Sequence, residues 1–323
     1  MTTLTYEQAK KIVSDFGSNW INNVSAPTIT IAPTITPTLN RLATISSPSN
    51  LPHLSTITSR RNDGYLTEDL LRVKSPSVFQ SESFNRTDKY TTIKTIDVIN
   101  ELKTLDFYPV RAEQSRTIRE DKKEFVKHML RFRHVSTLGV TSKEYIPEIV
   151  MINSHDGSTA YKIMFGIFRL VCANGLIVAN SMFSSQRLRH TGGDNTLERV
   201  KAHVISMSES TRMIDNKIDQ WQGITLDVDQ QRDYAQKAFD VYRGNTDLKT
   251  NVDNLIKTRH YQDRAKSDLW TVYNTVQENL QKGYFYAQQE NGNVQRARAI
   301  KSIDRNVKFN QGLWQLTEDF GNN

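Results

Sequence analysis

The sequence predicts an α+β protein: an antiparallel β-meander with flanking helices, followed by an all-helical C-terminal half. Two observations predict this fold class. Between residues 107 and 171, stretches such as FVKHMLRFRHV alternate in side-chain character at the two-residue period of strands. After Asn174-Gly175, apolar residues recur at three- and four-residue steps, which is the helical period. The 323 residues are enough for one large domain or two ordinary ones.

The chain divides into four predicted segments. Residues 1–25 predict an N-terminal helix. Residues 26–59 are rich in Pro, Thr and Ser and predict an extended tether, because each proline removes a backbone donor and fixes φ. Residues 60–194 predict a mixed core of helices and antiparallel sheet, and residues 195–323 predict a helical region packed on that core.

Local patterns predict the elements of the core in order. These are a short helix or turn at 67–71 capped by Thr67, a strand-like stretch at 89–93, a helix at 94–104, and strands at 107–117, 125–135, 147–153 and 159–171. The Asp156-Gly157 pair between the last two strands is a strong hairpin signal. We therefore expect a tight turn at 153–158, with Gly157 at positive φ.

The C-terminal half is predicted to consist of helices alone. The helical stretches cover 197–222, 227–243, 247–257, 264–281 and 296–318. Three tryptophans, Trp221, Trp270 and Trp314, fall on the apolar sides of these helices and are expected to be buried.

Composition and motifs exclude several kinds of site. The single cysteine, Cys172, excludes a disulfide framework and a thiolate zinc site, and its apolar surroundings favour an inert buried thiol. The sequence has no P-loop, dinucleotide-binding glycine motif or metalloprotease motif, and no apolar run long enough for a membrane span. We therefore expect a non-enzymatic cytoplasmic protein without cofactor or metal.

The basic residues gather in two places. The chain has 42 Lys and Arg against 35 Asp and Glu. Residues 74–145 contain 14 Lys and Arg against 10 Asp and Glu, and residues 281–310 contain six against two. A local basic surface attracts polyanions, of which nucleic acid is the commonest. The alternative is a solvated face with no partner.

A predicted hairpin around 111–133 supplies the candidate nucleic-acid contacts. They are Arg111, Arg116, Lys122, Lys123, Lys127, Arg131 and Arg133. On a strand, Lys127, Arg131 and Arg133 would share one face, and guanidinium groups bind phosphates in a bidentate manner. The alternative is a solvated hairpin whose charge is neutralised by interspersed acidic residues: Glu113, Glu120, Asp121 and Glu124. Three nearby aromatic residues are either stacking partners or core: Phe107, Tyr108 and Phe132.

The densest polar cluster is the motif loop between the third and fourth strands. It contains Asn153, His155, Asp156, Gly157 and Ser158. Such side chains bond to nearby backbone groups in turns, so a structural role explains the loop. The functional alternative is a loop that holds a phosphate or a partner. A metal site built from this loop and strand histidines is a further alternative to ordinary polar residues, and it would use His128, His134, His155 and Asp156.

Several long stretches carry a family resemblance. The most specific are FYPVRAEQSRT (107–117), PEIVMINSHDGSTAYKIMFGIFRLVCANGLIV (147–178) and RARAIKSIDRNVKFNQGLWQL (296–316). Over residues 66–323, interrupted around 223–265, the chain resembles conserved and largely uncharacterised proteins of bacteriophages, prophages and plasmids. This resemblance implies a mobile-element protein that acts in a bacterial cell. A helix leading into a meander, with a helix behind it, also resembles the core of single-strand annealing proteins, which hold one strand along a basic groove.

Two functional hypotheses follow. The first is a protein that binds or anneals single-stranded nucleic acid, DNA in particular, in phage recombination or replication. The second is a host-takeover or anti-defence protein that binds a bacterial protein, with residues 26–59 as a docking segment. Neither hypothesis requires a membrane, and both allow a homo-oligomer.

Overall fold

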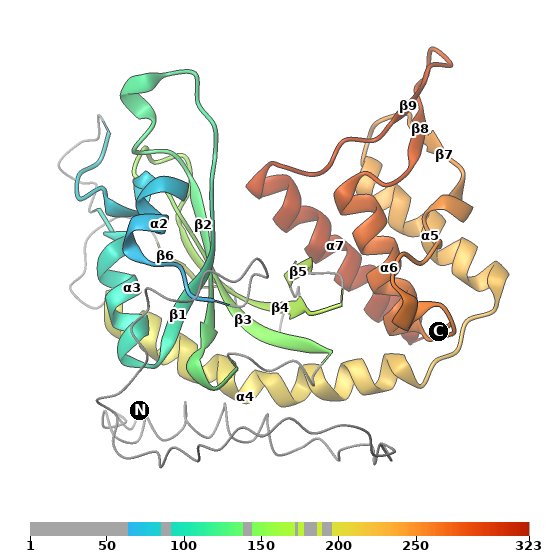
Figure 1. Ribbon diagram of the computed structural model, residues 1–323, viewed down its shortest axis with the longest axis horizontal. Coiled ribbons are helices and arrows are strands. Elements are labelled where there is room, and N and C mark those ends of the chain that lie inside the picture. The colour runs from blue at the N-terminus through green and yellow to red at the C-terminus, as the bar shows by residue number, and fades with distance from the viewer. Residues whose placement is uncertain are drawn as a thin grey trace, which may run out of the picture.

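The computed structural model describes residues 64–84, 92–137, 144–171, 174–177, 186–188 and 196–322. The predicted N-terminal helix, the tether at 26–59 and Cys172 lie outside the described residues. The α+β fold class is confirmed. In Figure 1 an antiparallel sheet lies on the left, a group of helices lies on the right, and α4 (Thr196–Gln222) runs below both. No helix in these ranges is long and apolar enough to cross a membrane.

The large sheet is antiparallel throughout. Its strands β1 (Phe107–Gln114), β2 (His128–His134), β3 (Tyr145–Asn153), β4 (Tyr161–Arg169) and β5 (Asn174–Ile177) lie in sequence order, and β6 (Gln186–Leu188) also pairs with β4. The four predicted strands of the core are therefore confirmed, with shorter ends for three of them. β1 ends this order, so its outer edge has no neighbouring strand among the described residues.

The strand-like stretch predicted at 89–93 is not a strand where the structure describes it. Residues 92–94 are irregular and lead into α3 (Thr95–Thr104), which confirms the helix predicted at 94–104. Ile93 is buried and its carbonyl accepts a hydrogen bond from the Asn153 side chain at 2.8 Å. The β-branched residues here therefore serve a helix entry and not a sheet, since propensity is overridden by tertiary contacts.

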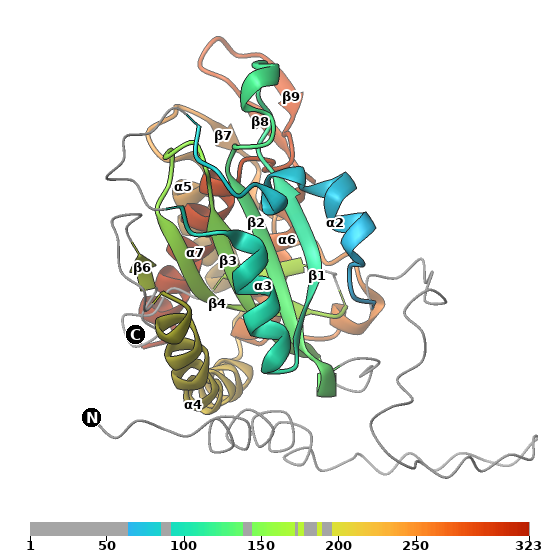
Figure 2. The same ribbon diagram turned by 90° about the vertical axis from the view of Figure 1, so that its left-hand side faces the viewer.

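One face of the sheet packs on α3 and the first part of α4. Alternate residues of β2, Leu130 and Phe132, are buried there with Val98 and Ile99 of α3 and Val200 of α4. Figure 2 shows α3 lying across this face with α4 beside it. The short helix α2 (Glu68–Lys74) and the 3-10 helix η2 (Pro76–Phe79) precede α3, and Thr67 caps α2 by accepting from Leu70 N at 3.3 Å.

The opposite face of the sheet is covered by the C-terminal half. Met129, Val150, Ile152 and Met164 form a second apolar cluster there with Ile303, the first residue of α7 (Ile303–Gly321). Because both faces are covered, the whole of β2 is buried. The side chains of β2 therefore point alternately into two buried layers, and neither face of the strand meets water.

The helical half is built around the predicted tryptophans. Trp221, Trp270 and Trp314 are at most 1% exposed, and the rings of Trp221 and Trp314 lie 4.7 Å apart between centroids. They join α4 to α6 (Leu269–Lys282) and α7, with α5 (Val228–Arg243) packed against both of these helices. The expected burial of all three tryptophans is therefore confirmed.

The C-terminal half is helical as predicted, but a small three-stranded sheet, which the sequence did not predict, interrupts it. The helix predicted at 247–257 is instead β7 (Lys249–Thr250) and the 3-10 helix η5 (Val252–Asn254). Strands β8 (Tyr286–Gln288) and β9 (Val294–Arg296) pair with each other, and β8 also pairs with β7. The last helix therefore begins at Ile303 and not near 296.

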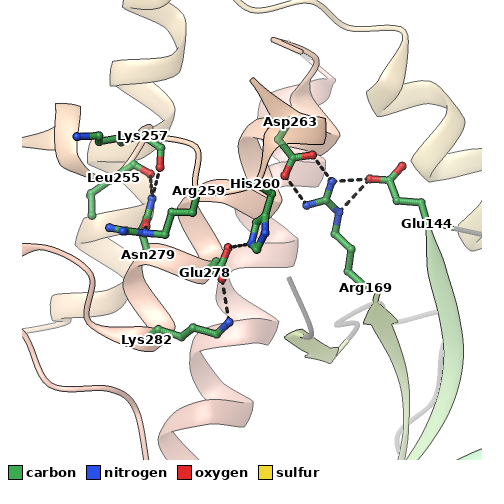
Figure 3. Close-up of polar contacts among 10 residues, drawn as sticks. All are labelled: Glu144, Arg169, Leu255, Lys257, Arg259, His260, Asp263, Glu278, Asn279 and Lys282. Carbon is green, nitrogen blue, oxygen red and sulfur yellow. Dashed lines mark hydrogen bonds and ion pairs between the residues drawn. The ribbon is translucent and has the colours of Figure 1, made fainter. Parts of the chain in front are cut away.

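A buried ion network joins the two halves (Figure 3). Arg169, at the end of β4, is 1% exposed and donates to both carboxylate oxygens of Asp263 at 2.7 and 2.9 Å. Asp263 ends the 3-10 helix η6 (Tyr261–Asp263) of the helical half. The same guanidinium donates to Glu144, just before β3, at 2.6 and 2.9 Å. One arginine thus fixes the sheet against the helical half at this side.

Candidate nucleic-acid interface

Two of the predicted phosphate contacts are buried in the sheet. Arg131 and Arg133 are 2% and 3% exposed, and both reach Glu148 of β3. Arg133 Nε donates to Glu148 Oε1 at 2.8 Å, and Arg131 Nε donates to the other carboxylate oxygen. A buried guanidinium requires a paired carboxylate because its desolvation is costly. The prediction that these side chains lie at the surface and contact the phosphates of a nucleic acid is therefore wrong.

The Asn174-Gly175 motif explains how these arginines are covered. A Cβ on Gly175 of β5 would overlap the Arg131 guanidinium, so only glycine lets the β5 backbone lie over that side chain. The guanidinium of Arg133 lies 4.0 Å from the centroid of the Phe168 ring. The Arg131–Glu148–Arg133 cluster is thus a structural centre of the sheet.

Lys127 and the candidate stacking residues also make contacts within the protein. Lys127 Nζ lies 2.6 and 2.9 Å from the carboxylate oxygens of Asp304, in the first turn of α7, and its side chain is 13% exposed. Phe107 and Phe132 are 3% and 0% exposed and belong to the core, so of the two alternatives the core is confirmed for these residues. The ring of Tyr108 stacks on Tyr65 at 4.5 Å.

The motif loop fastens three segments together. Asn153 Nδ2 donates to Ile93 O at 2.8 Å and to Thr95 Oγ1 at 3.0 Å, which holds the start of α3. The backbone of His155 donates to Phe125 O and accepts from Phe84 N, both at 2.9 Å.

The tip of the loop is a turn. Gly157 has φ 69°, as predicted, and Ser158 N donates to Asp156 Oδ1 at 2.9 Å. Burial raises the pKa of Asp156, but hydrogen bonds from Ser158 and Ser154 outweigh it, and the pKa is lowered overall. These contacts give every residue of the loop a structural role.

His128 is held as a neutral imidazole. Its Nδ1 lies 2.8 Å from Ser77 Oγ, and its Nε2 lies 2.8 Å from Thr95 Oγ1. Burial, followed by the nearby His155 ring at 5.5 Å, lowers the pKa of His128 to about 3. His134 lies at the other end of β2 beside Ser136. In the described part of the chain, no group of three His, Cys, Asp or Glu side chains is arranged to hold a metal.

A groove of about 890 Å³ lies between β1 and the chain that enters α7. On one side it is lined by seven consecutive residues, from Val110 to Arg116. Since alternate strand residues point to opposite faces, a groove that touches all seven follows the edge of the strand. The other lining residues are Leu66, Lys74, Gln281, Ile300, Lys301, Ser302 and Asn306.

The groove is positively charged. Lys74, Arg116 and Lys301 are exposed, and no carboxylate lies within 4.0 Å of them among the residues the structure describes. Arg111 also lines the groove, but its guanidinium lies 2.7 Å from Glu113. Two of the seven predicted contacts, Arg111 and Arg116, therefore meet at this groove.

The remaining predicted contacts lie on the loop that joins β1 to β2. Lys122 Nζ lies 5.1 Å from the Phe84 ring centroid, and Lys123 Nζ lies 3.6 Å from Glu120. Lys74 and Lys301 are not among the predicted contacts, because both lie outside the predicted hairpin around 111–133. Each nevertheless belongs to one of the two basic stretches, 74–145 and 281–310.

Comparisons with known proteins place the chain in a family. Residues 85–314 match the family described as "Domain of unknown function (DUF932)". Two proteins of Escherichia coli (strain K12), UPF0380 protein YafZ and UPF0380 protein YfjQ, are each 34% identical over 260 residues, covering 80% of this chain and 92% of each relative. No solved structure matches. The match covers the large sheet, most of α7 and the groove residues other than Leu66 and Lys74, and the chain belongs to the DUF932 family.

Proposed function

We propose that this protein binds single-stranded nucleic acid along the groove between β1 and the start of α7, without catalysing a reaction on it. One observation carries the proposal: Lys74, Arg116 and Lys301 line one groove and have no carboxylate partner among the described residues. Cations that are not neutralised internally bind phosphates and release the counterions condensed on them, which favours association.

The shape of the groove supports an extended ligand. The seven successive lining residues, five in β1 and two directly after it, span up to roughly 20 Å, which suits a short stretch of extended single strand. A meander with one helix before it and another behind is also the arrangement of the single-strand annealing proteins that the sequence resembles. Backbone-directed binding along a basic groove leaves sequence preference weak.

The proposed setting is the cytoplasm of a bacterial cell that carries a mobile element. It follows from the resemblance of residues 66–323 to phage, prophage and plasmid proteins. There the protein would serve recombination or replication by holding one strand.

A salt titration tests the proposal. Binding of labelled single- and double-stranded oligonucleotides is measured between 50 and 300 mM salt. Over this range the Debye length falls to somewhat less than half of its starting value. Changing Lys74, Arg116 and Lys301 together to Gln should weaken binding for every sequence alike. The slope of log K against log salt should become shallower by about two units for a single strand.

The matched control changes three exposed lysines of the helical half to Gln: Lys237, Lys257 and Lys266. Both triple variants lose three charges, so equal losses of affinity would show an effect of net charge and no site. Absence of binding by the unmodified protein at 50 mM salt, a condition that strengthens phosphate contacts, would refute nucleic-acid binding altogether.

One feature of the groove favours the second candidate, a host-takeover or anti-defence protein that binds a bacterial protein. The groove follows the outer edge of β1. At this edge Leu66 N, which lies outside the sheet, donates a hydrogen bond to Pro109 O of β1 at 2.7 Å. An extended peptide can add to such an edge as a further strand. This candidate predicts that no oligonucleotide competes with the partner.

A further inference from the structure

The small sheet of the helical half presents one face outward. Tyr286 lies opposite Arg296 on β9, and Gln288 lies opposite Val294. Lys249 of β7 lies opposite Gln288 on the other side. Because opposed residues and alternate residues share a face, the five side chains form one surface, which we call the outer face of β7–β8–β9. Ala287, between the two exposed β8 residues, is 5% exposed and points to the core.

Tyr286 is one of two largely exposed tyrosines of this half, with Tyr261. Its neighbour Phe285 is 1% exposed and packs with Phe239 and Tyr242, whereas Tyr286 is 60% exposed. Tyr284 is covered by the guanidinium of Arg259 at 4.2 Å. Among the described residues, no ring or cation lies against Tyr286. The strand therefore holds a large aromatic ring in solvent, so this ring adds little hydrophobic stabilisation to the folded protein.

The surroundings of this ring are basic. Arg296 pairs with Tyr286 across the two strands, and its guanidinium donates to Gly283 O at 3.4 Å and lies 5.8 Å from the Tyr284 ring centroid. Lys249 lies opposite Gln288 and is exposed. The stretch from 296 to 301 contains Arg296, Arg298 and Lys301 and no acidic residue. A polyanion is thus favoured at this face, and a positively charged or neutral apolar partner is not.

A short stretch of chain links the outer face to the groove. Lys301 lines the groove, and it follows Arg296 by five residues, which span at most about 18 Å when extended. Figure 1 shows the chain running from β9 directly to the start of α7. A single strand that lies along the groove can therefore reach Tyr286 within a few nucleotides.

We propose that the outer face of β7–β8–β9 is a base-stacking platform, on which Tyr286 stacks against an unpaired nucleobase of the strand held by the groove. The exposed Lys249 contacts a neighbouring phosphate, and Arg296 adds positive charge to the face. Stacking on an aromatic ring tolerates any base, since every base has a π face, but it requires that the base be unpaired. The platform thus gives selectivity for single strands. It rests on the proposed function of the groove.

An abasic scan tests the platform. A single abasic site is moved along a labelled single-stranded oligonucleotide that is just long enough to fill the groove and the platform, so that it binds in one register. The scan removes one base at a time and keeps every phosphate. The unmodified protein should lose roughly tenfold in affinity when the site reaches the position that stacks on Tyr286. Tyr286→Ser should bind the intact strand roughly tenfold more weakly and show no further loss at that position. Tyr286→Phe keeps the ring and should behave as the unmodified protein.

Tyr261→Ser is the matched control, because Tyr261 is 82% exposed and lies in η6, outside the small sheet. It should keep both the affinity and the abasic profile. If the protein binds with the expected salt dependence but Tyr286→Ser keeps the abasic profile, the platform is refuted and the groove stands. If Tyr286→Ser instead changes the mass in solution measured by light scattering, with binding unaltered, the face is a contact between copies and the platform is refuted. Absence of binding to any oligonucleotide refutes the proposed function itself.

Discussion

At the scale of single residues, burial decides which Lys and Arg side chains can contact a ligand. Arg131 and Arg133 were expected at the surface because strand spacing puts them on one face, and the spacing is right. The same spacing does not tell whether that face meets water or another layer. Glu148 was the missing signal: a carboxylate in the apolar run PEIVMIN is costly to bury unless it is paired. A lone acid in a buried strand predicts a buried partner cation.

Glu148→Gln should therefore be severely destabilising. It leaves two buried guanidinium groups without their carboxylate, and breaking such a pair costs about 3–5 kcal/mol. The free energy of unfolding from urea titration measures the loss. Glu68→Gln is the control, since the exposed Glu68–Arg72 pair should contribute less than about 1 kcal/mol. A loss below 1 kcal/mol for Glu148→Gln would contradict the role of this cluster.

His128 should make the fold sensitive to mild acid. Its pKa is about 3 in the folded protein and about 6.5 in the unfolded chain, because burial disfavours the charged form. Above pH 6.5 it is neutral in both states and has no effect. As the pH falls from 6.5 toward 3, the unfolded chain binds a proton that the folded protein does not, so stability is lost.

Between pH 6.5 and 5 this loss amounts to about 2 kcal/mol for one histidine. His128→Gln should remove that part of the pH dependence, as measured by urea unfolding at several pH values. Identical pH dependences for both proteins would show that His128 is not the group responsible.

At the scale of elements, periodicity predicted most of the fold. Two-residue and 3.6-residue patterns predict strands β1 to β4 and the helices α3, α4, α5 and α6, because each has at least one face packed on a core. They do not predict β5 and β6, which are four and three residues long. The small sheet was missed because its strands are two or three residues long, which is too short for a period to show. Asn291-Gly292 was a local hairpin signal, and Gly292 has φ 81°.

The turn of the motif loop gives a test at this scale. Gly157→Val places a β-branched residue at φ 69° and should destabilise the protein by roughly 1 kcal/mol or more. Gly223→Ala is the comparison, since Gly223 has no positive φ and an added Cβ meets its nearest atom at 3.4 Å. The thermal midpoint should fall for the first variant and change little for the second. Equal thermal midpoints for the two variants would contradict the assignment of Gly157 to a turn that requires positive φ.

At the scale of the whole molecule, the candidate site exists only because the two halves meet. One wall of the groove is β1 and the other is the chain that enters α7, nearly 200 residues later. The Arg169–Asp263 pair, Lys127–Asp304 and the cluster around Ile303 set the position of these walls. Sequence reasoning identified the two basic stretches but had no means to bring Arg116 and Lys301 together, because that contact depends on tertiary packing.

Photo-cross-linking of a bound single strand tests the groove most directly. A strand that carries 4-thiothymidine throughout is cross-linked to the full chain, and the modified peptides are identified by mass spectrometry. The cross-links should fall in 110–116 and 300–306, the two walls of the groove. Cross-links confined to other surfaces, such as α5 at Val228–Arg243, would contradict the assignment of this groove as the nucleic-acid interface.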